Sequence, residues 1–177
     1  LDLLDTAREV FIEDGRQRDA LLVDLSIGEC LLQLRRFGQV LDETRRIRAW
    51  FDDRGSRFEM GQALMNEAAA YSGLRRYDEA IGSLAEARAL FEAEENLVWA
   101  AAADLERAAV LLRRGAPAEG LGLARACAET FATHGLPLRE AQAHLLAARA
   151  AAADGRADEA GLLASEALAG AESAALP

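Results

Sequence analysis

The sequence predicts an all-α protein, built as an α-solenoid of stacked antiparallel helix pairs. Its 177 residues are 51% hydrophobic and 28% charged, and they include 40 alanines and 20 arginines, which lose little on entering a helix. Only 6% of the residues are aromatic, and the β-branched residues that favour strands are few. The third observation is a repeat, because matching residues recur every 40 positions along the whole chain.

The 40-residue repeat consists of columns of matching side chains. One column holds four phenylalanines, and three others hold small residues: Phe11, Phe51, Phe91 and Phe131; Ala68, Ala108 and Ala148; Ala80, Gly120 and Ala160; Ala87, Cys127 and Ala167. Small residues let helices approach closely, and the phenylalanines would fill the space between them. A single helix pair cannot bury its apolar face, so we expect the pairs to stack with the phenylalanines inside.

Each 40-residue row predicts two helices joined by a short turn. We expect a single domain of four and a half repeats over 1–177, with a lone helix at 1–14 and pairs at 17–53, 57–93, 97–133 and 137–172. Gly55 and Gly135 should end second helices, and Pro117 and Pro137 should lie in first turns. The chain opens on an unpaired second helix without an initial Met, so we expect a piece of a longer protein.

Tyr77-Asp78-Glu79-Ala80 opens a second helix, with small residues at Ala68 and Ala87 on either side. This pattern resembles the tetratricopeptide repeat (TPR), and the resemblance covers the whole chain. The repeat is longer than the period of about 34 residues that is usual in that family. The slot of the family's early Trp is filled by other residues: Asp24, Leu64, Asp104 and His144. More narrowly, the chain resembles the arrays of CHAT-domain and other multidomain bacterial signalling proteins.

The resemblance implies a non-catalytic scaffold that binds a protein partner, namely a peptide, a helix or a neighbouring domain, including a domain of the same parent chain. In this family the first helices line a concave groove, and the corresponding positions form the predicted groove: Leu22, Leu25, Glu29, Leu32, Gln62, Met65, Ala69, Ser72, Leu105, Leu112, Gln142, Leu145 and Arg149. The alternative is the regulatory or sensor arm of a larger bacterial enzyme, such as a CHAT-type peptidase or a signalling ATPase.

Pairs of arginines recur at the turn inside three helix pairs: Arg35, Arg36, Arg75, Arg76, Arg113 and Arg114. We call these six residues the arginine edge. One interpretation is a docking edge for an acidic partner, since arginine binds carboxylates through two parallel hydrogen bonds. The favoured interpretation is structural, because cations at the C-terminal end of a helix stabilise its dipole.

No catalytic, cofactor or metal site is predicted, and we do not expect an enzyme. Cys127 and His134, with Asp154 as orienter, could form a nucleophile–base pair. However, Cys127 occupies a small-residue column and His134 lies in a helix-ending turn, so packing and capping are the favoured roles. His144 and Glu140 are four residues apart and can pair.

The net charge of −10 argues against a nucleic-acid partner, because binding to phosphates needs a basic surface. No apolar run is long enough to cross a membrane. Two cysteines and no export signal predict the reducing cytoplasm. Leucines crowd the first helix, and the last is small and apolar around much of its circumference. We therefore expect self-association or continuation at the ends of the array.

Overall fold

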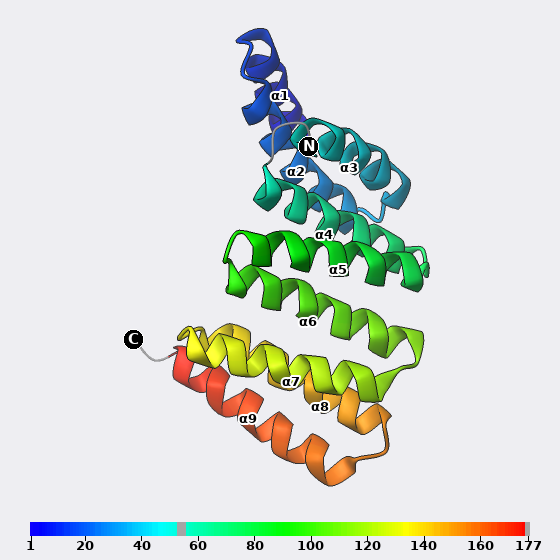
Figure 1. Cartoon of the computed structure of the whole chain (residues 1–177), viewed down its shortest axis with the longest axis vertical. Coiled ribbons are helices and arrows are strands. Elements are labelled where there is room, and N and C mark those ends of the chain that lie inside the picture. The colour runs from blue at the N-terminus through cyan, green and yellow to red at the C-terminus, as the bar shows by residue number, and fades with distance from the viewer. Residues whose placement is uncertain (53–55, 176–177) are drawn as a thin grey trace. The chain divides into compact units, whose positions relative to one another are not determined.

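The computed structural model describes residues 1–52 and 56–175, and this part of the chain is all-helical. Figure 1 shows the helices: α1 Asp2–Glu13, α2 Gln17–Gln33, α3 Phe37–Asp52, α4 Arg57–Gly73, α5 Tyr77–Ala93, α6 Leu97–Arg114, α7 Pro117–Thr133, α8 Pro137–Ala153 and α9 Ala157–Ala175. The predicted all-α class is confirmed, and the helices begin and end within a few residues of the expected bounds.

The chain divides into two compact units, an N-terminal unit at Leu1–Glu94 and a C-terminal unit at Glu95–Pro177. In the N-terminal unit each helix from α1 to α5 packs against the next, and α2 also contacts α4. In the C-terminal unit α6 to α9 pack in the same way, and α6 also contacts α8. Within each unit this is the packing pattern of an α-solenoid, in which successive hairpins stack on one another.

The turns between helices recur at a regular spacing along the chain. Among the described residues, a left-handed residue follows the helix end at seven places: Gly15, Arg35, Arg75, Glu95, Gly115, Gly135 and Gly155. The next backbone N–H commonly returns to the last turn, as when Arg36 N donates to the Leu31 carbonyl at 2.9 Å and Leu136 N to Phe131 at 3.0 Å. This bond, characteristic of a Schellman motif, ends the helix. Gly135 and the first-turn prolines therefore have their predicted roles, whereas Gly55 lies outside the described residues.

Arg75 holds a backbone conformation that suits glycine, with φ at +60°. Arg75→Gly is expected to raise the free energy of unfolding by about 1 kcal/mol, because a Cβ is strained in the left-handed region. Urea unfolding followed by circular dichroism measures the difference. The matched control is Gly115→Arg, at a φ of +91°. This variant should lower the free energy of unfolding by a similar amount. An unchanged urea midpoint in both variants would contradict the backbone strain expected at a positive φ.

The phenylalanine column forms the core, as predicted. Phe51, Phe91 and Phe131 are each 0% exposed, whereas Phe11 is half-buried. The Phe91 ring meets Phe58 edge-on, with ring centroids 5.6 Å apart. In the C-terminal unit Phe131 packs with Ala101, Cys127, Ala128 and Ala143.

Small residues permit the close packing of helices that the columns predicted. A Cβ on Gly61 of α4 would lie 2.6 Å from the Cζ atom of Phe91 in α5. In the C-terminal unit a Cβ on Gly120 would lie 3.0 Å from the carbonyl oxygen of Ala108. These separations are shorter than ordinary van der Waals contact, so the helices reach them only because the side chains are absent.

A buried carboxylate joins the first three helices of the N-terminal unit. Asp24 of α2 is 3% exposed, and its two oxygens accept from Arg8 of α1 at 3.3 Å and from Arg46 of α3 at 2.8 Å. Glu43 also pairs with Arg46. A buried charge is tolerated when it is paired in this way. Asp24 is thus held by ion pairs rather than by apolar packing.

Burial raises the pKa of Glu43 above its usual value of 4.5, and the Asp24 charge adds to the shift, while Arg46 and Arg8 oppose it. The folded state therefore retains this proton at a pH where the unfolded chain has lost it, so stability falls as the pH rises through the raised pKa. Glu43→Gln should remove this slope. Urea unfolding midpoints of the wild-type chain and of Glu43→Gln, measured between pH 4 and pH 7, test this prediction. The same dependence of the midpoint on pH in both proteins would contradict the raised pKa of Glu43.

Candidate functional site

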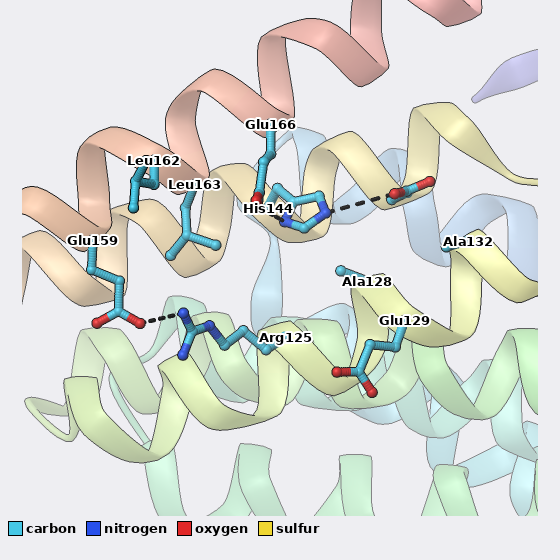
Figure 2. A pocket seen from close by; sticks show the side chains of 10 residues that line it. Arg125, Ala128, Glu129, Ala132, His144, Glu159, Leu162, Leu163 and Glu166 are labelled. Atoms are coloured by element: carbon cyan, nitrogen blue, oxygen red, sulfur yellow. Dashed lines mark ion pairs between the residues drawn. The ribbon is translucent and has the colours of Figure 1, made fainter.

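A pocket of about 480 Å³ opens in the C-terminal unit between α7, α8 and α9 (Figure 2). We call it the α7–α9 pocket. Its lining combines acidic, basic and apolar side chains from all three helices: Arg125, Ala128, Glu129, Ala132, Glu140, His144, Glu159, Leu162, Leu163 and Glu166.

Helical periodicity brings these side chains together. The α7 and α9 residues are spaced three, four and seven apart, so each set forms one face of its helix. Glu140 and His144 are likewise four apart on α8. Because α7 and α9 both pack on α8, the three faces converge on one space. Figure 2 shows the side chains of α7 and α9 on opposite sides of the pocket.

Ion pairs cross the pocket between helices. Arg125 of α7 pairs with Glu159 of α9, which also binds Arg156 at 2.8 Å. His144 of α8 has its Nδ1 atom 3.2 Å from Glu166 of α9, and its Nε2 atom 3.7 Å from Glu140. The imidazole thus lies between two carboxylates, as the dashed lines in Figure 2 show.

The His144–Glu166 pair repeats an arrangement found in the N-terminal unit. Asp24 and Arg46 are separated by 22 residues and join a first helix to its second helix. His144 and Glu166 have the same separation and link α8 to α9. The carboxylate lies on the first helix in one hairpin and on the second helix in the other, but the position of the polar contact is retained.

The charge of the α7–α9 pocket is negative. Four glutamates face one arginine and one histidine, and the Glu129 carboxylate forms no ion pair with a described residue. Leu163 and Ala128 are buried and give the pocket an apolar wall. An apolar wall with a negative rim suits a cationic group on an aliphatic stem, such as an arginine or lysine side chain.

The spacing of His144 and Glu140 predicted that they could pair, but the rest of the pocket was not predicted. The other lining residues belong to the second helices α7 and α9, whereas the predicted groove lies on the first helices. The available signal was the recurrence of a charged residue with leucine or alanine at spacings of three and four on both second helices. That signal alone does not show which faces meet.

The structure places the predicted groove residues on α2, α4, α6 and α8, with varied exposure. Leu25 and Ser72 are buried, and Leu25 belongs to the core around Phe51. Half-buried members are Leu22, Leu32, Gln62, Met65, Leu105 and Leu112. Exposed members are Glu29, Ala69, Gln142, Leu145 and Arg149. Leu145, at 53%, is the one large apolar side chain of this set that is exposed.

Consecutive first helices of the N-terminal unit touch directly beside these positions. The Asn66 side chain of α4 donates from Nδ2 to the Leu25 carbonyl of α2 at 3.2 Å. Gly28 makes room for it, because a Cβ there would lie 3.0 Å from Asn66 Nδ2. Gly28 lies forty residues before Ala68, in the small-residue column that predicts close approach, but the amide that occupies the space was not identified.

The arginine edge lies at helix ends, with all six residues exposed. Arg76 begins the turn into α5, where its Nε atom pairs with Glu79 at 2.9 Å and its guanidinium stacks on Tyr71. Arg16 and Asp19 repeat this pair at 2.8 Å. Arg113 and Arg114 form the last turn of α6, where a cation suits the dipole. These contacts support the structural interpretation of the edge.

The three residues considered for a nucleophilic site lie in ordinary structural positions. Cys127 is buried, and its Sγ atom donates to the Ala101 carbonyl at 3.3 Å. His134 is the exposed C-cap of α7, and Asp154 is the C-cap of α8. Among the residues that the structure describes, no group of three or more His, Cys, Asp or Glu is arranged to hold a metal ion.

Comparison with known proteins adds no relative: no protein-family model and no curated protein matches this sequence. Within the described ranges, none of the helices combines the length and the apolar character needed to cross a membrane.

Proposed function

We propose that this chain is a non-catalytic, protein-binding repeat module of the tetratricopeptide class, acting in the cytoplasm. Stacked helix pairs with buried phenylalanines and small residues at close contacts support the class. Cys30 and Cys127 are not joined in a disulfide, which suits a reducing compartment. Such a module binds a segment of another protein on side chains that its core does not use.

The observation that carries this proposal is the α7–α9 pocket. It is negatively charged, has an apolar wall and is formed by three successive helices of one unit. A basic side chain of a partner would lay its stem along Leu162 and Leu163 and bring its charge to Glu129 and Glu166. The predicted groove residues of the same unit, among them Leu145 and Arg149 exposed on α8, would contact the rest of the partner.

Selection from a random peptide display library on the immobilised chain tests the proposal. We expect enriched peptides to contain arginine or lysine beside apolar residues. Glu129→Gln combined with Glu166→Gln should weaken the binding of a selected peptide by about tenfold or more, since even one charge-assisted contact contributes roughly 1.5–3 kcal/mol. Binding should also weaken as salt is raised.

The control variant combines Glu106→Gln and Glu172→Gln, two exposed glutamates of the same unit that do not line the pocket. It changes the net charge equally and should leave peptide affinity unchanged. Equal weakening by both variants would show that peptide binding depends on the net charge of the chain and not on the pocket glutamates. Peptides that lose affinity only with Leu145→Asp would place binding in the predicted groove and contradict the role of the pocket.

A further inference from the structure

One column of the 40-residue repeat changes from arginine to alanine along the second helices. It holds, in chain order, Arg8 of α1, Arg48 of α3, Arg88 of α5 and Ala128 of α7. We call it the guanidinium column. Arg8 binds Asp24 of α2 at 3.3 Å, and Arg48 binds Glu67 of α4 at 3.2 Å. These two guanidinium groups therefore reach into the space between their own helix and the hairpin that follows.

Arg48 shows which acceptors a guanidinium finds in this space. Its Nη2 atom donates to both carboxylate oxygens of Glu86 on α5, at 2.9 Å and 3.2 Å, while its Nη1 atom donates to Glu67 at 3.2 Å. Glu67 is 9% exposed and also accepts from the hydroxyl of Ser83 at 2.8 Å. One guanidinium thus joins carboxylates of two helices, which its planar fork of donors allows.

The cleft beside Arg48 occupies the same columns as the α7–α9 pocket. It has a volume of about 270 Å³, and its described lining is Arg48, Ala49, Met60 and Glu86. Two repeats later, the same four columns line the α7–α9 pocket of about 480 Å³: Ala128, Glu129, Glu140 and Glu166. Helices both precede and follow α3 and α5 in the sequence, so this cleft is a property of the repeat.

The α7–α9 pocket retains carboxylates but lacks the arginine of the column. Where α3 carries Arg48, α7 carries Ala128, whose side chain ends at Cβ and faces the pocket (Figure 2). Glu166 occupies the column of Glu86, the residue that binds the Arg48 guanidinium through both oxygens. Glu129 adds a second carboxylate to the lining. The pocket therefore corresponds to the position of an absent arginine side chain.

The cations that already line the pocket do not take this position. Arg125 pairs with Glu159, which also pairs with Arg156. The Nδ1 atom of His144 lies 3.2 Å from Glu166, but this buried atom forms no hydrogen bond with a described residue. The Glu166 carboxylate is therefore able to accept hydrogen bonds from another donor.

We propose that the ligand of the α7–α9 pocket is an arginine side chain of a partner protein, whose guanidinium takes the position that Arg48 takes in the N-terminal unit. It donates to both oxygens of Glu166, and its other terminal nitrogen donates to Glu129. A lysine ammonium has the same charge but no planar fork, so arginine binds more tightly. This inference rests on the proposed function and narrows it from a basic side chain to arginine.

The two histidines of the chain provide the readout, because His144 lines the pocket and His134 is exposed at the end of α7. Their ring signals are followed by NMR while the full chain is titrated with N-acetyl-arginine amide or N-acetyl-lysine amide. The arginine probe should shift the His144 signals and leave those of His134 in place. Its dissociation constant should be about threefold to tenfold lower than that of the lysine probe, the effect of one additional hydrogen bond.

Two variants test the position of the guanidinium. Ala128→Arg restores the column, so the arginine probe should no longer shift the His144 signals; circular dichroism checks that this variant folds. Glu166→Gln, at an exposed residue, should remove the preference for the arginine probe over the lysine probe. Glu172→Gln, exposed on the same helix, is the matched control and should keep that preference.

The possible outcomes separate this inference from the proposed function. A dissociation constant of the lysine probe equal to or lower than that of the arginine probe would overturn the inference, but the pocket would still bind basic side chains. No shift of His144 with either probe would contradict both. A folded Ala128→Arg chain that still binds the arginine probe would also overturn the inference. So would tighter binding of free L-arginine than of the capped probe, because the ligand would then be the amino acid and not a partner protein.

Discussion

Phe91→Ala is expected to lower the free energy of unfolding of the N-terminal unit by about 3–5 kcal/mol. The ring is 0% exposed and lies between α4 and α5, against Phe58 and Gly61. Its removal leaves a cavity that the helices cannot close without breaking their other contacts. A shift of the urea midpoint with an unchanged slope would show lost stability rather than a changed unfolded state.

The same substitution at Phe11 is the matched control. Phe11 occupies the same column but is half-buried, and the Arg16 guanidinium stacks on its ring at 4.5 Å. Phe11→Ala should cost clearly less than Phe91→Ala, because less apolar area leaves the protein interior. Equal losses at the two positions would contradict the link between burial and stability in this column.

Gly61→Ala is expected to lower stability by about 1–3 kcal/mol, although alanine favours helix more than glycine does. A Cβ at this position would lie 2.6 Å from Phe91 Cζ and 2.7 Å from its Cε1 atom. The buried ring cannot turn away, so α4 and α5 must separate. Thermal unfolding of the purified variant measures the loss.

Gly82→Ala should raise stability, whereas Gly61→Ala lowers it. Gly82 lies in α5, is exposed, and has no atom within 4 Å of the position of a Cβ. The substitution therefore brings the helix propensity of alanine without overpacking, which is expected to raise stability by up to about 1 kcal/mol. A loss of stability in both glycine variants would contradict the specific contact between Gly61 and Phe91.

The left-handed residues at the turns show which helix ends the local sequence can predict. Glycines at 115, 135 and 155 indicate helix ends directly, because a residue without a side chain adopts a positive φ freely. Arg35, Arg75 and Glu95 adopt the same conformation without that signal. Only the regular spacing of the turns explains them, since the helices on both sides impose the geometry.

The α7–α9 pocket, in contrast, could not be predicted from local sequence. His144 and Glu140 form a recognisable pair on one helix, but Glu166 and Glu159 belong to α9, far along the chain from their partners His144 and Arg125. Which residues meet depends on how α7 and α9 are rotated about their axes when they pack on α8. A helical pattern reveals a face of each helix but does not show which face a neighbour will meet.

Sequence alone determined the helical class, the positions of the helices and the phenylalanine core, because each depends on residue type and on a period within the chain. Tertiary structure decided which polar groups became partners and which predicted groove residues were buried. These outcomes arise from contacts between side chains that are distant in sequence, and the helical period of a single segment carries no information about them.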